Sequence, residues 1–152
     1  IETTSRLPSA EEEAVPPPHL PSGLQVLVAE DDPLGAELIS RFLARYRVTV
    51  RVARSGEEGL RLLEREPFQA VVCDLRMPGI GGEGFYRELQ GRDPALARRV
   101  VFVTGDVLNP RAESFLRDTG CRHLMKPFSP QDLVEALDEI LEGTVSAQTD
   151  AP

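Results

Sequence analysis

Side chains that could bind a metal ion and a phosphate follow four short apolar runs of the sequence. Glu30 and Asp31 follow the run QVLVA, Asp74 ends the run QAVVCD, Thr104 follows RVVFV, and Lys126 follows CRHLM. Two carboxylates placed close together raise each other's pKa unless a cation lies between them. Mg²⁺ suits such a site, because it prefers oxygen ligands and commonly takes one or two carboxylates together with phosphate oxygens and water.

The same residues predict transfer of a phosphoryl group to a carboxylate. With a metal bound and the Lys126 ammonium opposite it, the site attracts a phosphoryl group, and Asp74 becomes a candidate nucleophile. Thr104 can donate its hydroxyl to a phosphoryl oxygen, and such a transfer needs mainly alignment and charge neutralisation. Of the 17 Lys and Arg residues only Lys126 is a lysine. This position therefore suggests a need for a compact point charge rather than the planar fork of arginine.

The elements that must position these residues alternate between strand and helix. Apolar runs predict strands at 25–29, 47–53, 69–74, 99–103 and 121–125, and helical spacing predicts helices over 33–46, 55–66, 83–90, 110–118 and 130–143. Asp32, Ser55 and Asn109 are expected to cap helices, and Gly143 to end the last one. Five β-α units predict an α/β fold, a doubly wound five-stranded parallel sheet in which all strand ends meet at one edge.

Composition limits the possible partners and compartments. The net charge of −8 argues against non-specific binding to nucleic acid or to an anionic membrane, and no apolar run is long enough to span a bilayer. Cys73 and Cys121 are too few for a disulfide framework and fit buried or half-buried thiols better than a redox pair. We expect a cytoplasmic location, with a parent protein that is either soluble or membrane-anchored.

Taken together, these features resemble the receiver domain of two-component signalling, the response-regulator fold. The resemblance covers about residues 24–143. It rests on the acidic pair in VLVAED, a DxxMPxxxG pattern from Asp74 to Gly82, the pair Thr104-Gly105, and the run KPF that begins at Lys126. It implies a flavodoxin-like (βα)5 sheet with strand order 2-1-3-4-5.

The resemblance implies a metal site and a phosphoacceptor. Asp74 would accept the phosphoryl group with Mg²⁺ as cofactor. Asp31 would bind Mg²⁺ directly, Glu30 would bind it through water, and the backbone carbonyl of Arg76 would complete the protein ligands. The chain would be a phosphoacceptor rather than an enzyme with turnover. A histidine kinase or a phosphotransfer domain would be the phosphodonor.

Further residues would act on the phosphoryl group or respond to it. Lys126 would pair with the phosphoryl group, across a Lys-Pro peptide that is cis in relatives, and Thr104 would be the hydroxyl switch. His123 stands where relatives usually have Tyr or Phe, and it is either a switch residue or a packed histidine. We expect Arg76 and Asp106 to pair over the site and slow hydrolysis. Output would use the surface of the fourth helix, fifth strand and last helix, a face that also suits a homodimer.

Two other functions share part of this pattern. Gly79, Gly81 and Gly84 form a GxGxxG that resembles a dinucleotide fingerprint, but four residues separate Asp74 from the first glycine, whereas the fingerprint turns tightly off its strand. A phosphatase of the haloacid dehalogenase type uses a similar set of residues. That family needs Asp-x-Asp, and here Arg76 stands at the second position.

The sequence divides into a Pro- and Glu-rich linker at 1–22, a receiver at 23–143 and a polar tail at 144–152. The segment 101–128 is similar to receivers at the C-terminus of hybrid histidine kinases. We therefore expect a receiver that belongs to a hybrid kinase, with a stand-alone response regulator as the alternative.

Overall fold

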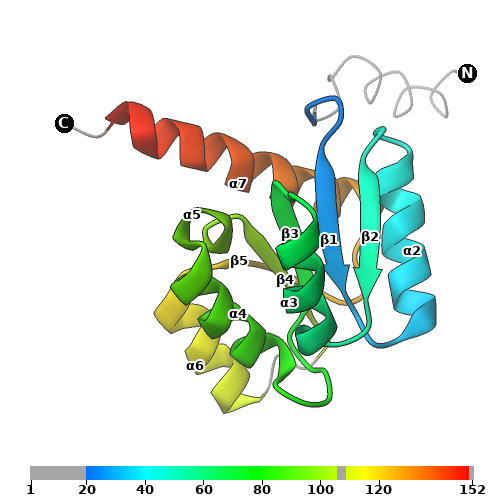
Figure 1. Cartoon of the computed structure of the whole chain (residues 1–152), viewed down its shortest axis with the longest axis vertical. Coiled ribbons are helices and arrows are strands. Elements are labelled where there is room, and N and C mark those ends of the chain that lie inside the picture. The colour runs from blue at the N-terminus through cyan, green and yellow to red at the C-terminus, as the bar shows by residue number, and fades with distance from the viewer. Residues whose placement is uncertain (1–19, 106–108, 151–152) are drawn as a thin grey trace, which may run out of the picture.

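Strands and helices alternate, apart from two consecutive helices before the fourth strand, along the part of the chain that the computed structural model describes, residues 20–105 and 109–150 (Figure 1). The elements are β1 (Gln25–Ala29), α2 (Pro33–Ala44), β2 (Thr49–Ala53), α3 (Gly56–Arg65), β3 (Ala70–Asp74), α4 (Gly81–Arg92), α5 (Pro94–Ala97), β4 (Val100–Thr104), α6 (Pro110–Thr119), β5 (Arg122–Met125) and α7 (Pro130–Asp150).

The five strands form one parallel sheet between two layers of helices. The strand order is β2-β1-β3-β4-β5, which confirms the predicted order. Helices α2 and α7 cover one face, and α3, α4 and α6 cover the other (Figure 1). Every residue of β3 and β4 is buried. This two-sided cover is the reason that these strands are continuous apolar runs rather than alternating ones.

Polar side chains begin the helices where the sequence predicts caps. Asp32 accepts a hydrogen bond from a backbone amide of α2, Ser55 from one of α3, and Asn109 from two of α6. A side-chain cap satisfies amide groups that have no partner within the helix. These caps fix the points at which the chain leaves the sheet edge and enters each helix.

Most helices match the prediction to within two residues at each end, and two helices differ from it by more. The short helix α5 was not predicted, although Asp93 caps it by accepting from Leu96 N at 3.1 Å and Pro94 occupies its first turn. The prediction that Gly143 ends the last helix is wrong, because α7 continues to Asp150. A glycine inside a helix costs only about 1 kcal/mol relative to alanine, and no proline follows before residue 152 to stop the helix.

The second strand is shorter than predicted. Residue Arg47 has a φ of 61°, in the left-handed region, so the chain turns there and β2 begins only at Thr49.

The two cysteines are unpaired thiols, as expected. Cys73 is fully buried in β3, and burial raises the pKa of its thiol well above the ordinary value, while Cys121 is partly buried.

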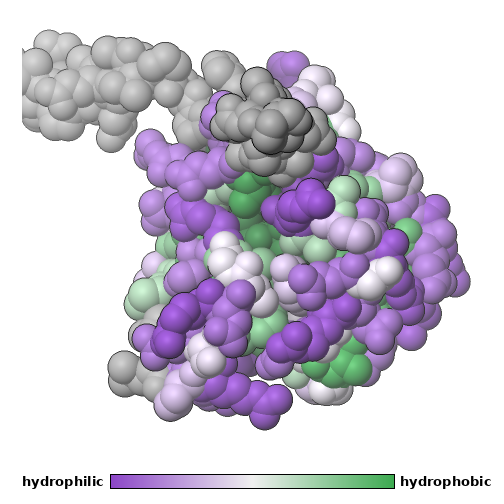
Figure 2. Space-filling model, turned by 90° about the vertical axis from the view of Figure 1, so that its left-hand side faces the viewer, coloured by the Kyte–Doolittle hydropathy of each residue, from purple (hydrophilic) through white to green (hydrophobic). Residues whose placement is uncertain are grey.

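The face shown in Figure 2 is mainly hydrophilic, with an apolar hollow between the polar side chains. Within residues 20–105 and 109–150, no helix is both long and apolar enough to cross a bilayer.

Candidate functional site

The carboxyl ends of β1, β3 and β4 bring the predicted site residues to one edge of the sheet. The register of the strands places Asp74, the last residue of β3, beside Glu30, which follows β1. The amide of Lys126 donates to the carbonyl of Thr104 at 2.8 Å, which holds the residue after β5 against the end of β4. Residues that are 96 positions apart in the sequence therefore meet at one place.

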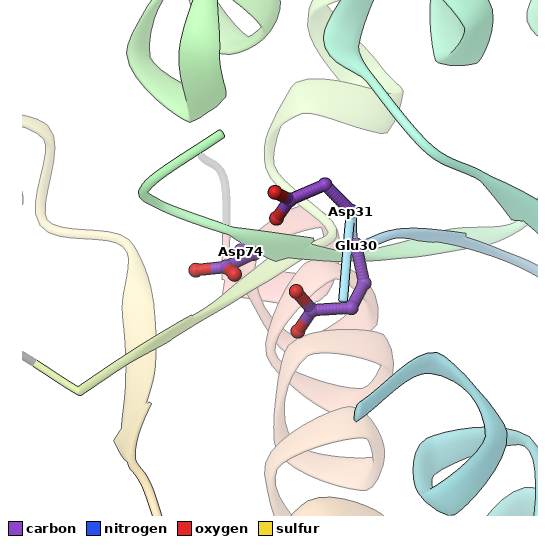
Figure 3. A group of neighbouring side chains, drawn as sticks. All are labelled: Glu30, Asp31 and Asp74. Atoms are coloured by element: carbon purple, nitrogen blue, oxygen red, sulfur yellow. The ribbon is translucent and has the colours of Figure 1, made fainter. Parts of the chain in front are cut away.

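Three carboxylates converge at this edge (Figure 3). Glu30, Asp31 and Asp74 each offer an oxygen atom, and these atoms all lie within 4.8 Å of one another. Glu30 and Asp74 are only 1% and 6% exposed, whereas Asp31 is exposed. The cluster therefore joins two buried acids to one acid that solvent can reach.

The Lys126 ammonium lies across two of these acids. It donates to Glu30 Oε1 at 3.0 Å and to Asp74 Oδ2 at 3.2 Å. Burial lowers the pKa of Lys126, but the hydrogen bond to Glu30 and the charges of Asp74 and Glu30 outweigh burial, so its pKa lies above the ordinary value. The site therefore keeps this side chain as a cation.

Glu30 contacts Lys126 directly, which the sequence did not predict. Its other oxygen, Oε2, accepts from the Asp32 amide at 3.2 Å. Burial is the largest cause that raises the pKa of Glu30 to about 7, followed by the contact with Asp74, while the hydrogen bond from Lys126 opposes them. No pattern in the sequence marks Lys126 as a partner of Glu30, since strand pairing brings the two together.

The loop between β3 and α4 approaches Asp74 closely. The Arg76 amide donates to Asp74 Oδ1 at 3.1 Å, and the Gly82 amide donates to the Leu75 carbonyl at 3.1 Å. A Cβ atom added at Gly82 would lie 2.6 Å from the Asp74 carbonyl oxygen, a distance that Cβ atoms do not adopt. This contact explains why the pattern that begins at Asp74 ends in glycine at position 82.

The other predicted residues lie as follows. Thr104 ends β4 and is 1% exposed. His123 is exposed on β5, which does not fit the alternative of a packed histidine. The Lys126–Pro127 peptide bond is cis, as the resemblance implied. Asp106 lies outside the described residues, so its pairing with Arg76 stays a prediction.

The chemistry of the cluster suits a hard divalent cation. All three clustered ligands are carboxylates, and the described residues contain no other group of three or more such metal ligands. Mg²⁺ prefers oxygen ligands and keeps several water molecules, so an acid open to solvent beside two buried acids fits it. Magnesium is therefore the ion that these residues are best suited to hold.

Two glycines of the GxGxxG pattern pack closely against protein, and Gly81 has a φ of 70°, in the left-handed region that favours glycine. A Cβ atom added at Gly84 would lie 2.8 Å from Ile80 Cβ, and one added at Gly79 would lie 2.6 Å from a Glu57 oxygen. The first of these glycines comes five residues after Asp74, the last residue of β3. The structure thus accounts for these glycines without a dinucleotide.

Known proteins are similar to this chain in sequence, and a solved structure is similar to it in fold. The transcriptional regulatory protein GlrR of Escherichia coli K12 is 33% identical over 85% of the chain, and the autoinducer 2 sensor kinase/phosphatase LuxQ of Vibrio vulnificus YJ016 is 27% identical over 76%. The chain spans only 28% of GlrR and 13% of LuxQ. A CheY-like receiver domain of Methanospirillum hungatei JF-1 superposes with a TM-score of 0.74 at 24% identity, covering 83% of this chain and 99% of that domain.

The family model described as the response regulator receiver domain matches residues 26–138, which include all the site residues and all five strands except Gln25, the first residue of β1. Receiver domains of this kind generally bind Mg²⁺ at acidic residues and accept phosphate from histidine kinases or phosphotransfer proteins. The chain therefore belongs to the response regulator receiver domain family of two-component signalling.

Proposed function

We propose that Asp74 accepts a phosphoryl group from a phosphohistidine and that its phosphorylation switches the surface formed by α6, β5 and α7. One observation carries this proposal. The Lys126 ammonium lies 3.2 Å from Asp74 Oδ2, inside a cluster of three carboxylates at the carboxyl edge of a parallel sheet. A buried carboxylate with a cation in contact on one side and a solvent-open acid on the other is suited to receive a phosphoryl group.

Asp31, Asp74 and the backbone carbonyl of Arg76 would hold Mg²⁺, with Glu30 as a ligand through water. Bound Mg²⁺ would neutralise the negative charge of the acids and of the incoming phosphoryl group. The exposed position of Asp31 supports this assignment, because it leaves one side of the cluster open to the hydrated ion.

The chain's own groups position the reaction. A carboxylate oxygen of Asp74 attacks the phosphorus, a P–O bond forms, and the P–N bond to the donor histidine breaks with its electron pair left on the imidazole. The Arg76 amide, 3.1 Å from Asp74 Oδ1, fixes the carboxylate while its other oxygen faces Lys126. Lys126 then transfers its contact to a phosphoryl oxygen, and the Thr104 hydroxyl donates to another.

Phosphorylation would be read through Thr104 and His123. Thr104 is buried at the end of β4, next to β5, and His123 is exposed on β5. When Thr104 turns toward the phosphoryl group, His123 would follow it inward and change the α6-β5-α7 surface, which we also propose as the homodimer face. An Arg76–Asp106 pair over the site would set the lifetime of the phosphate.

The phosphodonor would contact the apolar surface beside the site. Leu34 and Leu38 of α2 are 76% and 49% exposed, although most leucines in the described part of the chain are buried. Leu38 also lines a cavity of about 390 Å³ between α2 and the loop after β5, together with Phe128 and Lys126. A donor that brings its phosphohistidine to Asp74 would cover this apolar surface.

The parent protein would be a hybrid histidine kinase. The similarity to LuxQ, a protein named as a sensor kinase, supports this context. A stand-alone response regulator is the alternative, and the similarity to the transcriptional regulatory protein GlrR keeps it open.

Acetyl phosphate with Mg²⁺, followed by intact-protein mass spectrometry, tests the phosphoacceptor. We expect the wild-type chain to gain the mass of one phosphoryl group, Asp74→Asn to gain none, and removal of Mg²⁺ by EDTA to prevent the gain. Asp118→Asn is the matched control, because Asp118 is exposed on α6. An unmodified wild-type chain, or equal modification of Asp74→Asn, would contradict the proposal.

A further inference from the structure

The start of α4 is built differently from the start of every other helix in the described part of the chain. Each of the others begins with a side chain that accepts a hydrogen bond from a backbone amide: Asp32, Ser55, Asp93, Asn109 and Ser129. Helix α4 has no such side-chain cap. Since a missing cap costs about 1 kcal/mol, other contacts must hold this helix start in place.

The side chain of Ile80, the residue before α4, fills the space between two helices. A Cβ atom added at Gly56, in the first turn of α3, would lie 2.8 Å from Ile80 Cγ1. A Cβ atom added at Gly84 of α4 would lie 2.8 Å from Ile80 Cβ. Ile80 is 38% exposed, so this large apolar side chain lies at the surface in contact with the backbone of both helices.

The segment that Ile80 holds is the one that surrounds the phosphoacceptor. Ile80 ends the loop that begins at Leu75, and the Arg76 amide of this loop donates to Asp74 Oδ1. At the other end, the Gly82 amide donates to the Leu75 carbonyl, and the Gly84 amide to the Ile80 carbonyl, both at 3.1 Å. These hydrogen bonds close a short segment between Leu75 and Gly82. If Ile80 moved, this segment would move with it and alter the hydrogen bond that Asp74 accepts from the Arg76 amide.

We propose that Ile80 is a positioning residue for phosphorylation, because its side chain joins α3 to the loop that orients Asp74. The inference rests on the proposed phosphoacceptor role of Asp74. The side chain of Ile80 is apolar, so it can bind neither the metal nor the phosphoryl group itself. Ile80 acts by holding the backbone of Arg76 in place, so that the Arg76 amide meets Asp74 and the Arg76 carbonyl would face the metal. Misplacement of groups that position a reaction slows the reaction steeply.

Four variants test this role by phosphorylation with acetyl phosphate across a range of Mg²⁺ concentrations. Ile80→Ala removes the contact, and we expect a rate about tenfold lower together with a higher Mg²⁺ requirement. Ile80→Val keeps most of the side chain and should restore the rate. Gly56→Ala should also slow the reaction, because the new methyl group pushes Ile80 away. In the double variant Gly56→Ala/Ile80→Ala the two Ile80 atoms nearest to the new methyl group are gone, although the Gly81 carbonyl oxygen stays 3.1 Å away, so the rate should be close to that of Ile80→Ala alone.

Two controls separate positioning from loss of stability. Gly91→Ala adds a methyl group where no atom lies within 4 Å and should keep the wild-type rate. Leu63→Ala, in a partly buried position on α3, should lower the thermal midpoint without raising the Mg²⁺ requirement. Amide hydrogen exchange of Arg76, measured by NMR, gives a readout that needs no phosphorylation, and Ile80→Ala should accelerate it while Gly91→Ala does not.

Three results would overturn the inference: wild-type rates in Ile80→Ala, independent effects of Gly56→Ala and Ile80→Ala that multiply in the double variant, or unchanged exchange of the Arg76 amide. Failure of the proposed function looks different. In that case wild-type protein itself stays unphosphorylated, while the exchange measurement still decides whether Ile80 orders the loop.

Discussion

At the scale of single residues, one cation between two buried acids accounts for the electrostatics of the site. Lys126 contacts Glu30 and Asp74 at 3.0 and 3.2 Å, and it is the only lysine in a chain rich in arginine. A flexible stem with a point charge can leave one carboxylate for a phosphoryl oxygen without the two-bond geometry that an arginine fork prefers.

Replacement of this lysine should therefore slow phosphorylation even when the charge is kept. We expect Lys126→Ala to lower the rate with acetyl phosphate by about 10²-fold, the usual effect of removing one group that stabilises the transition state. Lys126→Arg should recover only a small part of the rate. Time courses of intact mass measure both variants, and a Lys126→Arg rate equal to wild type would contradict the stated need for lysine.

The protonation of Glu30 should make stability depend on pH in the absence of metal. Its pKa is about 7 in the folded chain, against an ordinary value of 4.5. Between these values the folded state holds a proton that the unfolded state has released, so the free energy of unfolding should fall as pH rises from 4.5 to 7 and then level off. Urea titrations in EDTA measure this trend. Glu30→Gln should flatten it, and an identical pH dependence in the variant would rule out Glu30 as its source.

At the scale of elements, close backbone contacts fix the loop that carries the phosphoacceptor. Gly82 lies so near the Asp74 carbonyl that a Cβ atom would sit 2.6 Å away, whereas Gly91 on the same helix faces open space. The two positions are thus a matched pair, with the same helix and the same side-chain change but opposite surroundings.

Alanine at these two glycines should have opposite effects on stability. Gly82→Ala should lower the free energy of unfolding by about 1–3 kcal/mol, because the loop must move to admit the methyl group. Gly91→Ala should raise it by up to about 1 kcal/mol through helix propensity. Chemical denaturation measures both, and a neutral Gly82→Ala would show that the close contact is not required.

Element boundaries were predictable where a local signal marks them. Asp32, Ser55 and Asn109 announce helix starts because a short polar side chain caps its own neighbours. The end of α7 was mispredicted, since a lone glycine permits a helix end but does not enforce one, and α5 is only one turn long. The left-handed Arg47 carries no sequence signal at all.

At the scale of the whole molecule, strict alternation of strands and helices was enough to predict the sheet, because parallel strands buried on both faces leave a continuous apolar signature. The edge where Asp31, Asp74, Thr104 and Lys126 gather followed from that topology. The sequence could not predict the distances between the side chains of the site. The direct contact of Lys126 with Glu30, and the depth of Glu30, depend on the pairing of distant strands.

The surface next to the site gives a whole-molecule prediction about the phosphodonor. Leu34→Asp changes an exposed side chain of α2 outside the carboxylate cluster. Transfer from a phosphorylated histidine phosphotransfer domain should fall by about tenfold or more, because an introduced charge opposes burial of the interface, whereas acetyl phosphate should react at the wild-type rate. Equal losses with both phosphodonors would point to damage of the site instead.

The central claim is that Asp74 itself carries the phosphate, and chemical trapping tests it most directly. Borohydride reduces an acyl phosphate to an alcohol, so treatment of the phosphorylated chain should convert residue 74 to homoserine. Peptide mass mapping after reaction with acetyl phosphate and Mg²⁺ should find that change in the peptide that contains Asp74, and find it in no sample treated with EDTA. Trapping at another residue, or none in protein that has gained phosphate, would contradict the account.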